Sequence, residues 1–107
     1  MRPELSPILN TLHREFENLY GPRLSGIVLY GSQARGDMTS GSDVDVMVIL
    51  EGPVDPGSEI TRTSKLTAAL SLEYDIVLSC LFISADRFRN EQSPLLLNVR
   101  REGIPIP

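Results

Sequence analysis

The chain has 107 residues, of which 41% are hydrophobic and 22% charged, and its formal net charge is -4 at pH 7. This length supports one domain with a single modest core, so we expect one domain over residues 1–107. The negative charge argues against a protein that binds nucleic acid through bulk positive potential. No apolar run approaches the ~20 residues of a membrane helix. A single cysteine, Cys80, cannot form an internal disulfide, so we expect a cytoplasmic protein without a membrane association.

The N-terminal third of the chain predicts a helix followed by a strand. Leu5 to Tyr20 is the predicted helix, because apolar residues recur at three- and four-residue steps. Ser6-Pro7 is typical of a helix start, and Gly21-Pro22 ends the pattern. Leu24 to Tyr30 is mostly apolar and is predicted as a central strand. Tyr30 at its end either packs in the core or leans toward a bound base.

A glycine–serine step, Gly31-Ser32, ends this strand, and a second strand bearing two aspartates follows. Between them we expect a short helical segment, Gln33 to Asp37, and a polar loop, Met38 to Ser42. Gly31 would let the backbone approach a phosphate closely, and Ser32 offers a hydroxyl. A helix starting after Ser32 would present free amides to the same anion. Arg35 is a candidate phosphate ligand, with an ion pair to Asp37 or Glu51 as the equal alternative.

The second strand, Asp43 to Leu50, carries Asp43 and Asp45 at its start and is otherwise apolar. Side chains alternate across a strand, so the two carboxylates share one face, with Cα atoms roughly 6.5 to 7 Å apart. Two like charges at this distance repel, and a divalent cation would hold both ionised. Mg²⁺ suits such a site, because it takes one or two carboxylates together with water and substrate phosphates.

The C-terminal half predicts a helix from Ser58 to about Ser71, a third strand from Tyr74 to Phe82, and two further helices, one beginning at Ser84 and one running from Ser93 to Arg101. Ile104 to Pro107 is confined by its prolines to a sheet edge or a tail. We therefore expect an α/β fold with a small mixed β-sheet and helices packed mainly on one side. Cys80 is predicted to be a buried small residue rather than a reactive thiol.

Two more acidic residues, Glu73 and Asp75, lie two residues apart, at the start of the third predicted strand. If this strand pairs beside the second, one of them comes within cross-strand reach of Asp43 and Asp45. Asp75 is the better candidate because it lies inside the strand, and Glu73 is the second choice. The alternative is an ordinary carboxylate at the sheet edge.

The spacing of Gly31-Ser32, ten residues and Asp43-Val44-Asp45 resembles the nucleotidyltransferase superfamily that includes DNA polymerase beta, and most closely its minimal nucleotidyltransferase (MNT) branch. The likeness is dense from Leu24 to Leu50 and looser beyond. It implies that Asp43, Asp45 and a third acid, here Asp75, hold two Mg²⁺ ions and are catalytic. It also implies that Gly31, Ser32 and Arg35 bind the nucleotide. The expected reaction moves AMP from ATP to a hydroxyl and releases pyrophosphate.

The resemblance also implies a partner. Stand-alone MNT proteins of this size are typically antitoxins paired with a HEPN-domain ribonuclease toxin, and they resemble protein adenylyltransferases that modify a toxin tyrosine. Two alternatives stay open. One is a non-catalytic subunit that masks the toxin or only binds nucleotide. The other is a small-molecule nucleotidyltransferase of the aminoglycoside-modifying type, which usually carries an extra helical domain.

Overall fold

A computed structural model describes residues 5–31, 34 and 43–106 of the chain. Its elements are α1 (Leu5–Tyr20), a 3-10 helix (Gly21–Arg23), β1 (Leu24–Tyr30), β2 (Asp43–Leu50), α3 (Pro56–Tyr74), β3 (Val77–Ser84), α4 (Ala85–Asn90), α5 (Pro94–Glu102) and β4 (Ile104–Pro105). The first helix and the first two strands have the predicted bounds. Apart from Ala34, the predicted segments at 33–37 and 38–42 lie outside the described residues.

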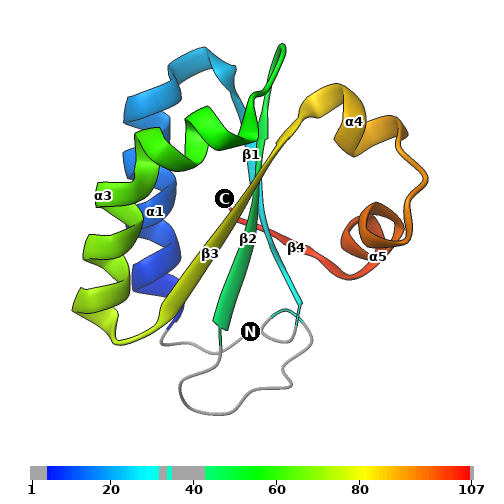
Figure 1. The fold of residues 1–107 in the computed structure, drawn as a ribbon. Helices are drawn as coiled ribbons and strands as arrows, with labels where there is room; N and C mark the ends of the chain where they lie inside the picture. Colours follow the sequence, from blue (N-terminus) through cyan, green and yellow to red (C-terminus); the bar gives the residue numbers. More distant parts are fainter. Residues whose placement is uncertain (1–4, 32–33, 35–42, 107) are drawn as a thin grey trace.

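The strands form one four-stranded mixed sheet in the order β3-β2-β1-β4 (Figure 1). β1 pairs antiparallel with β2 and with β4, while β2 and β3 run parallel, joined by the crossover helix α3. Parallel neighbours need such a crossover, which explains why the longest helix lies between these two strands. The predicted mixed α/β sheet is confirmed, and the C-terminal segment lies at an edge, as expected.

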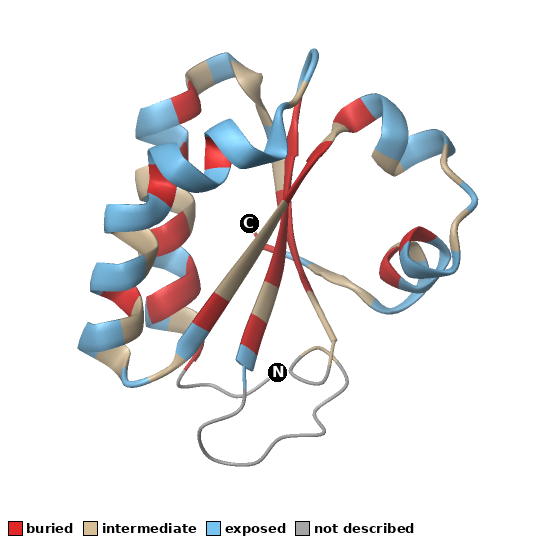
Figure 2. Cartoon of the chain, in the orientation of Figure 1, coloured by how far each residue is buried: buried red, intermediate tan, exposed pale blue. Residues whose placement is uncertain are grey.

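Helices cover both faces of the sheet, rather than mainly one (Figure 1). α1 and α3 cover one face, where Val44, Val46 and Val48 point into what we call the α1/α3 core. α4 and α5 cover the other, where Met47 and Ile49 point into the α4/α5 core. Figure 2 shows buried positions running along the central strands. The prediction of one-sided packing was wrong because the short helices α4 and α5 still supply enough apolar side chains to cover the second face.

The junction between α3 and β3 also differs from the prediction. The helix continues to Tyr74, and the strand begins only at Val77. Asp75 caps the helix in the left-handed conformation, with φ 54°, and its amide donates a hydrogen bond to the Ser71 carbonyl. An aspartate is one of the few residues with a side chain that adopts this conformation readily. Asp75 therefore precedes the third strand instead of lying inside it.

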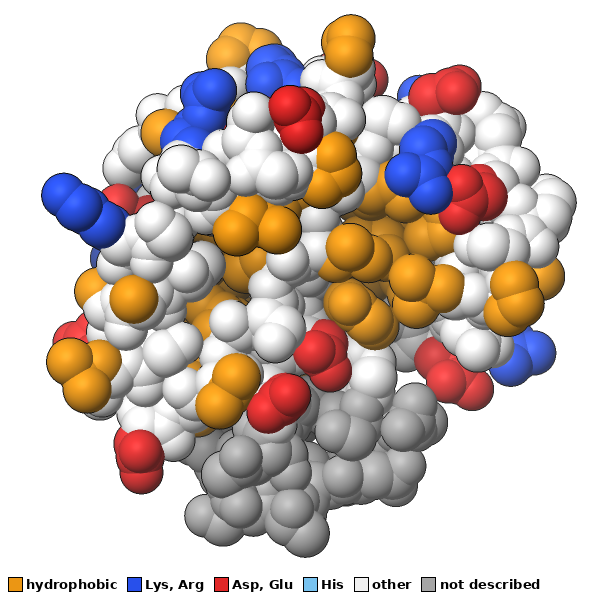
Figure 3. Space-filling model, in the orientation of Figure 1, with side chains coloured by type: hydrophobic (Ala, Val, Ile, Leu, Met, Phe, Trp, Pro, Cys, Tyr) orange, Lys and Arg blue, Asp and Glu red, His pale blue; other side chains and the backbone are white. Residues whose placement is uncertain are grey.

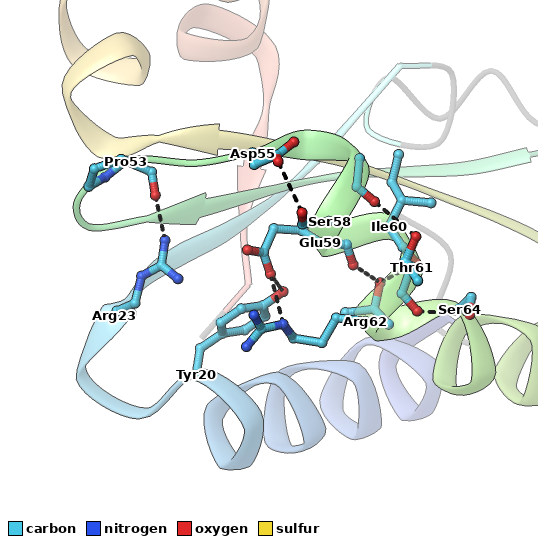
Figure 4. A network of polar contacts seen from close by, with 12 residues as sticks. Tyr20, Arg23, Pro53, Asp55, Ser58, Glu59, Ile60, Thr61, Arg62 and Ser64 are labelled. Atoms are coloured by element: carbon cyan, nitrogen blue, oxygen red, sulfur yellow. Dashed lines mark hydrogen bonds and ion pairs between the residues drawn. The ribbon is translucent and has the colours of Figure 1, made fainter.

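A buried polar contact joins the end of α1 to the start of α3 (Figure 4). The Tyr20 hydroxyl donates to Glu59 Oε1 at 2.6 Å, and Arg62 Nε lies 3.4 Å from the same oxygen. Glu59 is only 4% exposed, so these two donors satisfy a carboxylate that would otherwise be buried without compensation. Within the described part of the chain, no helix is both long and apolar enough to cross a membrane.

Candidate active site

The two aspartates of β2 lie at the end of the sheet where β2 begins. Asp43 is exposed and Asp45 half-buried, and both share the face of Met47 and Ile49, which α4 and α5 cover further along. Asp45 pairs across the antiparallel ladder with Tyr30, the last residue of β1. Asp45 is thus flanked by β1 and β3, and Asp43, two residues earlier, pairs with Val77 of β3.

Gly31 lies directly against the Asp45 carboxylate. It has φ 75°, and a Cβ built on it would lie 2.9 Å from Asp45 Oδ2. Any other residue would be strained by the left-handed backbone and would push against the carboxylate. The structure therefore brings together the glycine of the Gly-Ser step and the second aspartate. In the sequence, only the resemblance to the nucleotidyltransferase motif had connected these two residues. Ser32 and Arg35 lie outside the described residues.

The electrostatics of the pair favour a bound cation. Burial raises the pKa of Asp45, and the Asp43 charge raises it further. The pKa of Tyr30 is raised as well, first by burial and then by the Asp45 charge. Carboxylates whose ionised forms are disfavoured in this way are stabilised by a divalent cation. Two carboxylates on one face of a strand end fit Mg²⁺, which completes its shell with water and substrate oxygens.

The predicted third carboxylate is not brought into this pair. Opposite Asp43 and Asp45 on the parallel strand β3 stand Val77 and Ser79, while Asp75 lies in the turn before β3 and Glu73 in the last turn of α3. Across the described residues, no group of three His, Cys, Asp or Glu side chains could hold a metal ion. The placement of Asp75 inside a strand was wrong because this residue caps α3 in the left-handed conformation, and its role as a ligand stays a prediction.

Residues of α5, which the sequence did not single out, form a wall beside the site. A cavity of about 240 Å³ is lined by Tyr30, Gly31, Leu95, Asn98, Val99, Glu102 and Gly103. A larger cavity of about 620 Å³ lies further along the same face, between β1, α4 and α5, and none of the predicted site residues lines it. The α5 residues were missed because a helical stripe shows which residues share a face but not which end of the sheet they reach.

Comparison with known proteins identifies the family. The family described as "Nucleotidyltransferase domain" matches residues 9–98. Two proteins of Methanocaldococcus jannaschii are similar: "Putative protein adenylyltransferase MJ0604", 34% identical over 82 residues, and "Putative protein adenylyltransferase MJ0141", 30% identical over 76 residues. These alignments cover 73% and 71% of this chain, respectively, and 76% of each relative.

A solved structure shares the fold. A chain from the "Crystal structure of the toxin-antitoxin with AMP-PNP" superimposes with a TM-score of 0.62 at 23% identity, over 92% of this chain and 72% of that one. The matched family spans both strands of the site and the Gly31–Asp45 contact between them. The chain therefore belongs to the nucleotidyltransferase domain family, and it is a nucleotidyltransferase.

Proposed function

We propose that this protein is a cytoplasmic, Mg²⁺-dependent protein adenylyltransferase that acts as an antitoxin. It transfers AMP from ATP to a tyrosine of a HEPN-domain ribonuclease toxin and so neutralises that toxin. The names of the two archaeal relatives support a protein acceptor. The toxin–antitoxin structure with a similar fold supports a toxin as the partner, and its AMP-PNP supports an adenine nucleotide.

The observation that carries the proposal is the contact of the Asp45 carboxylate with the left-handed Gly31, beside Asp43. Asp43 and Asp45 would hold the metal, which would neutralise phosphate charge and lower the pKa of an attacking hydroxyl. Gly31 leaves its backbone open to the phosphates, and Ser32 would donate its hydroxyl to them. These residues hold the triphosphate so that its α-phosphorus faces the acceptor.

The transfer itself is a displacement at phosphorus. The acceptor oxygen forms a bond to the α-phosphorus, and the bond from that phosphorus to the oxygen shared with the β-phosphate breaks. Pyrophosphate leaves with that oxygen, and the hydroxyl proton passes to solvent. What this chain contributes is position and charge rather than a covalent intermediate, as is usual for phosphoryl chemistry.

The test is incubation of the protein with ATP labelled at the α-phosphate, Mg²⁺ and the product of the neighbouring gene. We expect label on that protein, and loss of label with Asp45→Asn. Asp86→Asn, at the start of α4 and the far end of the sheet, is the matched control and should label normally. Asp75→Asn tests the third carboxylate, since asparagine also tolerates the left-handed backbone. Wild-type labelling in this variant would remove Asp75 from the site.

The absence of a third carboxylate beside the pair, within the described residues, favours a second candidate. In it, the protein neutralises its partner by binding alone, with the motif retained only to bind nucleotide. Tight binding and inhibition of the toxin without any label, unchanged by Asp45→Asn, would identify this function. Label that appears on a small molecule and never on protein would contradict both candidates.

A further inference from the structure

The two edges of the sheet are built very differently. The β4 edge has two residues and includes Pro105, so it offers little to an additional strand. β3, at the other edge, is 8 residues long, has no charged residue and no proline, and pairs with β2 without a register shift. Proteins usually protect long edges with charges, prolines or bulges. An unprotected edge of this length is typical of a strand that receives another strand.

The backbone of β3 has unused hydrogen-bonding groups on this side. The Leu78 amide donates to Ser71 Oγ at 3.2 Å, so it points away from β2. Alternate residues of a parallel pair face the same side, and the amides of Cys80 and Phe82 therefore also point outward. Neither of these two outward amides donates a hydrogen bond to any of the described residues. Buried or covered amides are nearly always paired, so this edge is suited to an added strand.

The surface around the edge is apolar and half-open. Ser79, Cys80 and Leu81 in the middle of β3 are only half-buried, and Val77 at its start is 53% exposed. Figure 3 shows hydrophobic side chains gathered between the two helical layers on the side where β3 is nearest the viewer, with acidic side chains next to them. An extended segment at this edge would cover apolar surface as well as pair its backbone.

The edge is also at the right distance from the carboxylates. Strands lie ~4.8 Å apart, so a strand added to β3 would run about 10 Å from β2. Side chains on its α4/α5 face would pass over Ser79, the small residue opposite Asp45. A tyrosine hydroxyl stands roughly 6 to 7 Å from its own Cα and a serine hydroxyl about 2.4 Å, so only the longer side chain can approach Asp45, by leaning across Ser79 toward β2. This span favours a long acceptor side chain.

We infer that the acceptor protein presents its hydroxyl on an extended segment that adds to the open edge of β3, with a tyrosine on the Asp45 side of the sheet. Such strand addition uses main-chain hydrogen bonds for affinity and alternate side chains for specificity. The inference rests on the proposed function for its acceptor, and the binding step itself does not. A second copy of this chain at the same edge is the competing occupant.

The binding test uses a seven-residue peptide of alternating threonine and valine with a central tyrosine, at 2 mM. We expect amide exchange at Cys80 and Phe82 to slow by about tenfold when the peptide is added, as for a site held about nine-tenths occupied. The same peptide with alternate backbone amides methylated keeps its side chains but cannot complete the ladder, and it should give no protection.

The transfer test uses the same peptides with labelled ATP and Mg²⁺. We expect label on the tyrosine peptide, and at least tenfold less on the methylated peptide and on one with serine at the centre. Protection of the two amides without any label would leave strand addition standing and contradict the tyrosine's placement, while the proposed function would be contradicted only if the product of the neighbouring gene also stays unlabelled. No protection by the peptide, equal protection by its methylated form, or protection that depends only on the concentration of this chain would overturn the inference.

Discussion

Replacing Asp45 with asparagine should make the protein more stable while it abolishes transfer. The two aspartates are two residues apart on one strand, which places their Cα atoms roughly 7 Å apart. At that separation two unit charges repel by about 0.6 kcal/mol in water and about 2.4 kcal/mol at an effective dielectric constant of 20. Because the pair is partly solvated, we expect Asp45→Asn to raise the free energy of unfolding by about 1 kcal/mol at low salt. For a domain of this size that raises Tm by roughly 4 to 8 °C.

This gain in stability should depend on pH. The folded-state pKa of Asp45 is raised above its ordinary value of 3.8, so the ionised form opposes folding. That penalty is fully present above the raised pKa and disappears as the pH falls below the ordinary value, where both states are protonated. Thermal unfolding without metal should therefore show the gain at pH 7 and none near pH 3. Added Mg²⁺ should raise Tm for the wild type and not for the variant.

Asp86→Asn, an exposed position on α4, is the control and should change stability by less than about 0.5 kcal/mol. A variant at Asp45 that is less stable than the wild type at pH 7, or equally stabilised at pH 3, would refute the account of a repulsive pair. Stabilisation by Mg²⁺ that persists in the variant would place the cation elsewhere.

Three further changes test other parts of the structure. Gly31→Ala should lower the free energy of unfolding by about 1 to 2 kcal/mol and remove most transfer activity, because φ 75° strains the new residue and its Cβ contacts Asp45. Unfolding experiments measure the first effect and labelling assays the second. Gly103→Ala should lower the free energy of unfolding by roughly 1 to 3 kcal/mol, since the new Cβ would lie 2.5 Å from Val28 Cγ1. Gly26→Ala is the control: its Cβ would have nothing within 4 Å, so the same unfolding assay should show a much smaller loss. Cys80 is half-buried, and this burial raises the pKa of its thiol to about 12. Iodoacetamide should therefore modify it at pH 8 far more slowly than in the unfolded chain, and equal rates would contradict the raised pKa.

The part of the site on β1 and β2 could be predicted because two local signals agree there. An apolar run that ends in Gly31 and a second run that begins with Asp43 and Asp45 define two strands and the faces of their side chains. Their antiparallel pairing then brings Asp45 opposite Tyr30, beside Gly31. Only the pairing partner had to be supplied by the fold.

The start of the third strand could not be predicted from the same signals. Tyr74 and Ile76 alternate with Asp75 as strand residues would, yet Tyr74 ends α3, and both apolar side chains pack against the α1/α3 core. Leu72, 85% exposed, obscures the apolar stripe of the helix at this point. The left-handed backbone of Asp75 separates the two elements, and the periodicity of apolar residues does not predict a single left-handed residue.

The central position of β2 has a consequence for how the enzyme would work. Val44, Val46 and Met47 are 0% exposed, with the valines in one core and the methionine in the other. Sliding this strand by one residue would exchange the two faces and break both cores at once. The separation of the two aspartate Cα atoms is therefore set when the protein folds, before any substrate binds.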